Sequence, residues 1–309
     1  MKKLLIHPEE LTKKWVDRMV ENDIGILGIH PVGGRQAYLH LANMLEEQKK
    51  PEVRALYDYA AEKGLKIEYG IHAAGYLLPR ALFAEHPEYF RVDENGERNP
   101  DLNFCFSNKE AMELFLENTA KLAKQLYGSS KRYFLWLDDA KDAHCHCPEC
   151  RKLSPSDQQM TVLNAMVRRL RKDDPEASLA YLAYVTAITP PETVKPEEGI
   201  FLEYAPYERK MDRPVSEMPE SEIENLKDLL AFFGKENSVV LEYWYDNSLF
   251  SGYKKPPKVL VPNNDNVRAD LDFYRALGFE DLSSFACYLG DDYDELFDSI
   301  DLTGIAEKK

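Results

Sequence analysis

The sequence predicts a closed (β/α)8 barrel, in which eight parallel strands alternate with helices. Three observations support this prediction: the chain has 309 residues, its apolar runs are short and continuous, and amphipathic stretches lie between them. Continuous apolar runs are typical of strands that are buried on both faces of a parallel sheet. The expected strands are Ile24–His30, Leu65–His72, Asn103–Phe106, Tyr133–Asp138, Leu179–Thr186, Ile200–Ala205, Val239–Tyr245 and Ser283–Leu289.

Helical patterns separate these strands, and several carry end signals. Ser107 and Glu110 have the spacing of a capping box, Ser154 offers an N-cap to the helix that follows, and Gly64 suits a helix C-terminus. An open doubly wound sheet is the competing fold, but no G-x-G-x-x-G follows the first expected strand. The expected helices are Pro51–Lys63, Lys109–Tyr127, Ser156–Lys172, Glu220–Phe233 and Asn266–Leu277.

We expect one barrel domain over residues 1–309, with residues 1–23 as a short N-terminal extension that contains a helix. Residues 24–30 would then form the first strand of the barrel.

The composition excludes some classes of partner. Hydrophobic residues make up 44% and charged residues 30%, which is typical of a soluble globular protein. The net charge of −15 opposes binding to nucleic acid. No apolar stretch has the length of a membrane helix, and the run Leu4–Ile6 is too short for a signal peptide. We therefore expect a cytoplasmic protein without a nucleic-acid or membrane partner.

Carboxylates stand where a barrel places its functional residues, at the carboxyl ends of strands. The fourth expected strand ends in Asp138 and Asp139. Two close carboxylates raise the pKa of one of them, which lets a general acid stay protonated near neutral pH. The alternative is that one aspartate caps the next turn while the other is solvated.

Glu203 and Glu242 each interrupt an otherwise apolar strand. A buried glutamate is rare unless it is paired or functional. Either one could act as the nucleophile or base of a sugar-cleaving enzyme, which needs two carboxylates. The alternative is a structural ion pair with Arg80 or Arg209.

Further polar and aromatic residues at or near strand ends are candidates for substrate binding. Aromatic faces stack on sugar rings, and arginines bind carboxylates such as that of a uronate. Each histidine could instead be a structural residue with satisfied hydrogen bonds. The candidates are His30, His72, Arg80, Tyr184, Arg209, Trp244 and Asp246.

Three of the five cysteines, Cys145, Cys147 and Cys150, lie within six residues. This spacing is too close for an ordinary disulfide framework and favours a metal site over free surface thiols. Structural zinc takes four sulfur or nitrogen ligands, whereas catalytic zinc keeps an open position. A sulfur-rich set therefore indicates structural zinc.

The fourth zinc ligand could be Cys105, His144 or His146. We favour Cys105 because it lies at the end of the third expected strand, which would neighbour the fourth. The expected role of the metal is to hold the loop that follows Asp139.

Several segments together resemble a known family: HPEYFRVDENGERNPDLNFCFSN, YFLWLDD followed by CHCPEC, LSPSDQ with the later Asn164, and LEYAPYER. They are similar to domain of unknown function 4838, barrel proteins of glycan-degrading bacteria that are distantly related to family 20 hexosaminidases and family 67 α-glucuronidases. The resemblance covers about Ile24 to Tyr288. It implies a glycoside-hydrolase-like barrel in which Asp138 and Asp139 match the Asp-Glu pair of the hexosaminidases, with a shorter second acid.

The hypothesis from the sequence is a glycoside hydrolase that acts on an oligosaccharide. Asp139 would be the general acid, Asp138 would orient it or the substrate, and Glu203 or Glu242 would be the nucleophile or base. Two alternatives stay open: a glycan-binding barrel without catalysis, and a zinc-dependent hydrolase that uses the Cys/His cluster.

Overall fold

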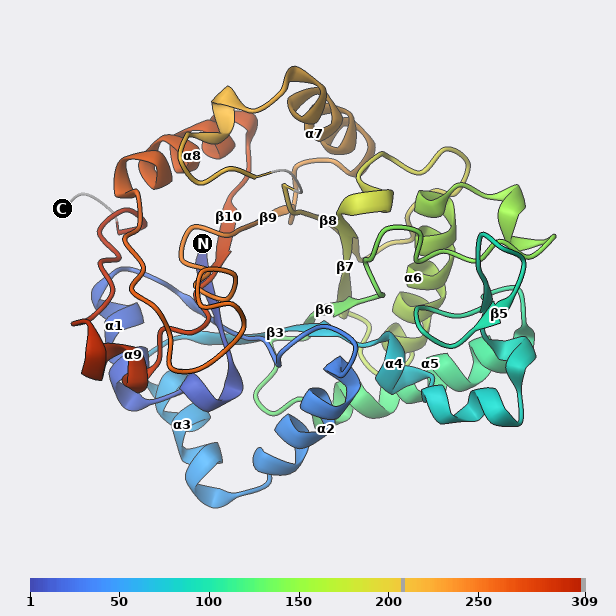
Figure 1. Cartoon of the computed structure of the whole chain (residues 1–309), viewed down its shortest axis with the longest axis horizontal. Helices are drawn as coiled ribbons and strands as arrows, with labels where there is room; N and C mark the ends of the chain where they lie inside the picture. Colours follow the sequence, from blue (N-terminus) through green and yellow to red (C-terminus); the bar gives the residue numbers. More distant parts are fainter. Residues whose placement is uncertain (207–208, 307–309) are drawn as a thin grey trace.

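The computed structural model describes residues 1–206 and 209–306, apart from the side chains of residues 221 and 222. It confirms the predicted barrel, which is closed by parallel pairing in the order β1-β10-β9-β8-β7-β6-β3-β2 (Figure 1). The barrel strands are β1 (Lys2–Ile6), β2 (Ile26–Ile29), β3 (Lys66–His72), β6 (Arg132–Trp136), β7 (Ser178–Ala183), β8 (Ile200–Tyr204), β9 (Val239–Glu242) and β10 (Asp281–Phe285).

The predicted N-terminal extension is wrong, because β1 is a barrel strand that pairs with both β10 and β2. All five of its residues are buried, including Lys2 and Lys3. The Lys3 ammonium group lies inside the barrel, 3.0 Å from a carboxylate oxygen of Glu68 and over the ring of Phe134. Residues 2–21 therefore form the first strand-helix unit of the barrel.

The predicted strand at residues 103–106 is also wrong. The segment lies in the long connection between β3 and β6, and β6 itself pairs with β3. Asn103 uses its side-chain amide to bind the backbone of Asp138 and Ala143, so this segment braces the connection that follows β6. One missed strand and one false strand left the expected number of eight unchanged.

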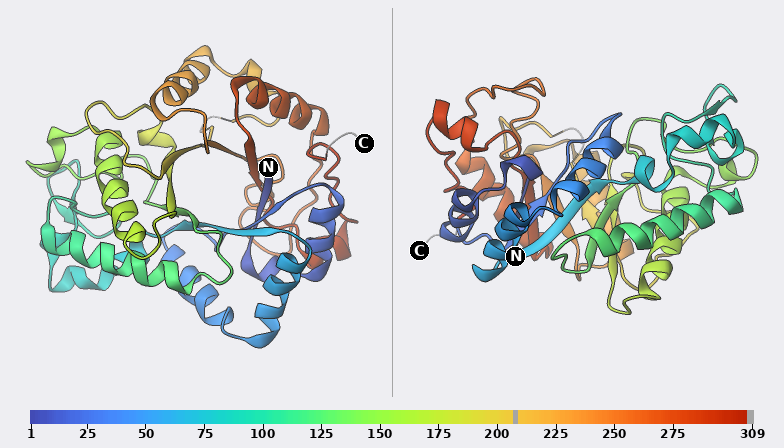
Figure 2. Two further views of the ribbon diagram at one scale, coloured as in Figure 1. Left: turned by 180° about the vertical axis from the view of Figure 1, so that it is seen from behind. Right: turned by 90° about the horizontal axis from the view of Figure 1, so that it is seen from below.

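Helices surround the barrel, as the left view of Figure 2 shows. Ser154 caps α6, as the sequence predicts, while α5 is capped by Asn108 rather than by Ser107. Within the described residues, no helix has both the length and the apolar character that crossing a membrane requires. The α-helices are α1 (Lys13–Glu21), α2 (Ala37–Glu47), α3 (Pro51–Glu62), α4 (Ala74–Leu77), α5 (Lys109–Gln125), α6 (Pro155–Arg171), α7 (Glu220–Phe233), α8 (Asn264–Leu277) and α9 (Asp291–Leu296).

Short elements complete the connections between these units. A two-stranded hairpin forms from β4 (Arg91–Val92) and β5 (Arg98–Asn99) in the connection between β3 and β6. The 3-10 helices span Pro8–Glu10, Arg80–Ala84, Pro87–Tyr89, Cys150–Lys152, Val185–Ala187 and Val215–Glu217.

The direction of each side chain along a strand decides whether it can reach the mouth of the barrel. Successive residues point to opposite faces of a strand. Leu5, Trp136, Leu182 and Leu241 belong to the apolar cluster inside the barrel. On β9, Leu241 and the residue two further on therefore face the interior, and Glu242 faces the surrounding helices.

Candidate active site at the barrel mouth

A cavity of about 520 Å³ opens where the barrel strands end. Its volume is within the range of ligand pockets, and this end of the barrel is the usual place of active sites. Among the lining residues that the structure describes, the carboxylates are Asp139 and Asp246, and none is a lysine or an arginine. The cavity therefore combines two acids with aromatic and histidine rings.

The adjacent aspartates after β6 point to different places. Asp138 accepts a hydrogen bond of 2.5 Å from Arg80, and the Asn103 side chain holds both its N–H and its carbonyl group, at 2.7 and 2.9 Å. Asp139 lines the mouth cavity, and Asp138 does not. The structure thus separates the predicted pair into an acid that faces the cavity and a neighbour that holds the turn.

Three histidines line one side of the cavity. His7 follows β1, His30 follows β2, and His72 ends β3. The ring centroids of His7 and His30 are 5.7 Å apart, and those of His30 and His72 are 5.8 Å apart. The sequence analysis did not identify His7, because the strand before it was assigned to an N-terminal extension.

Two of these histidines are neutral at neutral pH. Burial lowers the pKa of His7, and burial together with the nearby His7 and His72 places the pKa of His30 well below its usual value. The Nδ1 of His7 lies 2.7 Å from the His30 carbonyl oxygen, and the Nδ1 of His30 lies 2.8 Å from that of Gly70. Nδ1 therefore carries the proton, and Nε2 of each ring is a hydrogen-bond acceptor.

Aromatic side chains form the opposite wall. Tyr184 follows β7 and lines the cavity together with Tyr243, which the sequence analysis missed. The ring of Tyr243 stacks on Phe285 with the centroids 5.6 Å apart. Burial raises the pKa of Tyr243 well above its usual value, and its hydrogen bond with Tyr184 and the charge of Asp139 raise it further. The alternation of side chains along β9 could have identified Tyr243, because it lies two residues after the interior residue Leu241.

Glu203 lies deeper in the barrel than the cavity. Its carboxylate is fully buried and accepts a hydrogen bond of 2.6 Å from the Trp136 indole, and it is absent from the cavity wall. Burial raises its pKa to about 7, although Lys3 and the Trp136 bond act in the opposite direction. The structure does not bring Glu203 to the mouth cavity, since the Trp136 indole, which lines the cavity, covers its carboxylate.

Replacing Glu203 by Gln is expected to change how stability depends on pH. The carboxyl group has a raised pKa in the folded state, so its contribution is full below the unfolded pKa of 4.5 and is lost as the pH rises to about 7. That loss is about 3 kcal/mol at about 1.4 kcal/mol per unit. Urea unfolding between pH 4.5 and 8 should show a decline in stability that is smaller by this amount in Glu203→Gln than in the wild type and in Glu198→Gln, an exposed control. Parallel profiles for all three proteins would contradict it.

Glu242, Arg209 and Trp244 lie outside the barrel wall rather than in the site. Arg209 Nε donates to both carboxylate oxygens of Glu242 at 3.2 Å, and its guanidinium also pairs with Asp270 on α8. Trp244 donates to the same Asp270 at 2.9 Å, and Tyr274 donates to Glu242 at 2.7 Å. The structure does not bring these three residues to the mouth cavity: Glu242 and Trp244 face the surrounding helices, and Arg209 pairs with carboxylates there.

Arg80 lines a second hollow beside the mouth cavity. Its guanidinium is occupied by Asp138 and by the carbonyl groups of residues 102 and 103. Asp139, His72 and Gly34 line both hollows. Asp139 therefore stands at the junction of two adjoining spaces.

Four buried cysteine sulfurs gather behind this site. Cys105 Sγ lies 3.6 Å from Cys147 Sγ and 3.9 Å from Cys150 Sγ, and these atoms and Cys145 Sγ all lie within 4.8 Å of one another. Zinc in a tetrahedron of sulfurs at about 2.3 Å places neighbouring sulfurs about 3.8 Å apart. Cys105 arrives from the connection before α5 and not from a strand, and the four sulfurs have the spacing of a metal site.

The sequence matches the family described as "Domain of unknown function (DUF4838)" over residues 21–292, which is most of the chain. The chain belongs to the DUF4838 family. This confirms the resemblance seen in the sequence. No curated protein matches it.

Solved structures that resemble this DUF4838 protein are barrels with low sequence identity. The β-galactosidase from Rahnella sp. R3 is 13% identical with a TM-score of 0.55, and the match covers 92% of this chain and 50% of that one. Endo-glycoceramidase II from Rhodococcus sp. is 10% identical with a TM-score of 0.55, covering 92% and 73%. The clostridial cellulose synthase subunit Z from Clostridioides difficile is 12% identical with a TM-score of 0.51, covering 92% and 90%.

This chain spans half the length of the Rahnella galactosidase. At these identities the comparisons establish a fold like that of glycoside hydrolases. The chemistry has to be argued from the site itself.

Proposed function

We propose that this DUF4838 protein is a glycoside hydrolase for a neutral glycan, with Asp139 as the general acid and Asp246 as the second carboxylate. The observation that carries the proposal is the mouth cavity, where these two acids share a space with aromatic rings. Glycosidases need such a pair, one carboxyl group to protonate the leaving oxygen and another to act as nucleophile or base. Similarity to glycoside hydrolase barrels is consistent with this reading.

The position of Asp246 supports its role as the second carboxylate. It follows β9, and its Oδ1 accepts a hydrogen bond of 2.9 Å from the Ser248 N–H. Asp139 follows β6, which is three strands away around the barrel. The two acids therefore approach the cavity from different sides, as a pair that flanks a sugar must. Asp246 takes the place that the sequence analysis gave to Glu203 or Glu242.

The position of Asp139 suits an acid that protonates a bond between two sugars. It lines both the mouth cavity and the second hollow, where Arg35, Tyr38 and Asp101 are among the lining residues. A glycan that fills both spaces would pass its glycosidic oxygen beside Asp139. The ring in the mouth cavity would be the one whose bond is cleaved.

A neutral sugar fits the cavity better than a uronate. A carboxylate in the substrate would need a cation, yet no lysine or arginine is among the described residues that line the mouth. Both His7 and His30 are held neutral by burial. The arginines that suggested uronate binding are engaged elsewhere, Arg80 with Asp138 and Arg209 with Glu242.

A panel of aryl glycosides tests this function. We expect turnover of at least one neutral aryl hexoside or N-acetylhexosaminide and none of the aryl uronides, with the anomer of the product read by NMR. Binding of neutral oligosaccharides without turnover over long incubation would overturn catalysis and favour a glycan-binding barrel. Turnover confined to uronides would contradict the neutral specificity.

We also propose that Cys105, Cys145, Cys147 and Cys150 hold a structural zinc ion. The spacing of the sulfurs supports this, and four thiolate ligands leave no open position for chemistry. Its role would be to hold the connection that carries Asp139. Elemental analysis should find zinc that survives dialysis in the wild type and is lost in Cys150→Ser. Retention of the metal by that variant would exclude the site.

A further inference from the structure

The loop that carries the cysteines also has a second face. Cys145 and Cys147 turn their sulfurs into the buried cluster, while the alternating Asp142, His144 and His146 form a separate group. The His146 Nε2 lies 2.7 Å from Asp142 Oδ1, and the His144 Nδ1 lies 3.6 Å from the same oxygen. The two imidazole centroids are 4.3 Å apart. Two ring nitrogens thus converge on one carboxylate.

Polar atoms of this group lack the partners that buried atoms need. Asp142 Oδ2 and His144 Nδ1 are both inaccessible to solvent and make no hydrogen bond within the described residues. A buried polar atom without a partner is unfavourable, and few such atoms occur in folded proteins. His144 Nδ1 is too far from Asp142 for a hydrogen bond but at a suitable distance to share an ion with it.

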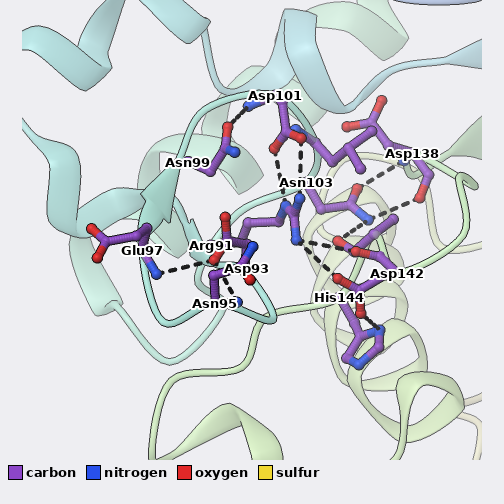
Figure 3. A network of polar contacts seen from close by, with 12 residues as sticks. Arg91, Asp93, Asn95, Glu97, Asn99, Asp101, Asn103, Asp138, Asp142 and His144 are labelled. Carbon is purple, nitrogen blue, oxygen red and sulfur yellow. Dashed lines mark hydrogen bonds and ion pairs between the residues drawn. The ribbon is translucent and has the colours of Figure 1, made fainter.

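The charges around the group also favour a cation. Figure 3 shows Arg91 between Asp101 and Asp142, with Asp93 nearby. The guanidinium donates two bonds of 3.1 Å to the Asp101 carboxylate, and it reaches Asp142 chiefly through the backbone oxygen, also at 3.1 Å. Its distance to Asp142 Oδ2 is 3.5 Å. One arginine is therefore shared among three carboxylates.

We propose that Asp142, His144 and His146 bind a divalent transition metal such as Zn²⁺, in a site separate from the four-cysteine cluster. Imidazole nitrogens with carboxylate oxygens are a donor set that zinc accepts. The site is independent of the proposed hydrolase activity. One loop would hold two ions on opposite faces, one among sulfurs and one among nitrogen and oxygen atoms.

Metal titration of the full chain, purified without a histidine tag and stripped with EDTA under reducing conditions, tests the proposal. After gel filtration we expect about two zinc ions per wild-type chain and about one in the double variant His144→Ala/His146→Ala. His86→Ala removes an exposed histidine outside the group and should retain two. Circular dichroism verifies that each variant is folded.

Cobalt distinguishes the two sites by colour. Thiolate ligands give Co²⁺ intense near-ultraviolet charge-transfer bands, whereas nitrogen and oxygen ligands give weak visible bands only. We expect the double variant to keep the intense bands and to lose the second equivalent of bound Co²⁺.

A wild type that binds one ion with thiolate bands, or a double variant that still binds two, would overturn the second site. A wild type whose cobalt spectrum shows the weak visible bands but no thiolate bands would instead exclude a metal at the cysteines and support the Asp/His site.

Discussion

Asparagine in place of Asp139 is expected to lower kcat/KM by about a thousandfold on a substrate with a poor leaving group, such as an oligosaccharide. The amide has the size of the carboxyl group but cannot deliver the proton that the departing oxygen needs. With 2,4-dinitrophenyl glycosides the departing oxygen needs no proton, and the expected loss is about tenfold or less. Steady-state kinetics on a series of aryl glycosides with different leaving-group pKa values measures this difference.

Two matched variants separate the roles of the acids. Asp246→Asn should reduce activity by a similar factor for good and poor leaving groups alike, since a nucleophile or base is needed with both. Asp138→Asn removes the partner of Arg80 but leaves both cavity acids in place, so a smaller loss is expected. If Asp139→Asn were fully active, or lost activity equally across the series, Asp139 would not be the general acid.

Methionine in place of Arg209 is expected to destabilise the fold by about 3–5 kcal/mol. The side chains of Glu242 and Asp270 are fully buried, and both pair with this guanidinium. Without it, two carboxylates remain in an apolar layer between β9 and α8. Urea unfolding of the wild type and the variant measures the change in the free energy of unfolding.

The loss of stability caused by Arg209→Met should increase as the pH rises. Burial raises the pKa of Glu242 to about 7, and Arg209 is the main influence that lowers it. A carboxyl group with a raised folded pKa contributes stability that is lost as the pH rises through that value. Removing the arginine raises the pKa further, so the variant should lose more stability between pH 6 and 8 than the wild type.

Arg213→Met is the matched control, because Arg213 is exposed and pairs with its neighbour Asp212. A change of about 0.5 kcal/mol or less is expected there. KM should be unaffected in Arg209→Met measured under folding conditions. A raised KM with unchanged stability would restore the idea that Arg209 binds substrate.

The sequence predicted most of the barrel because its strands are buried on both faces. Such strands appear as continuous apolar runs, and seven of the eight were visible as such. The exception was β1, which begins with Lys2 and Lys3. Lys3 is buried because its ammonium group pairs with Glu68 and lies over Phe134, two residues that are distant along the chain. No local pattern carries that information.

Local spacing was also sufficient to propose the cysteine site. Cys145, Cys147 and Cys150 are close in the sequence, and their convergence follows from the short loop alone. The fourth sulfur, Cys105, is 40 residues or more away from them. It was chosen for its place on an expected strand that does not exist, and the hairpin of β4 and β5 and its neighbouring segments bring it there instead.

By itself the sequence determined the family, the barrel, the acid pair after β6 and the cysteine spacing. Only the tertiary structure decided which polar residues face the cavity. In a continuous apolar run the sequence does not show which residues face the barrel interior and which face the helices. Glu242 could therefore not be assigned to the outer layer, nor Tyr243 to the mouth. Glu203 is buried below Trp136 by contacts with segments that are distant in the sequence. Distant contacts also fix the turn after β6, which directs Asp138 to Arg80 and leaves Asp139 at the cavity.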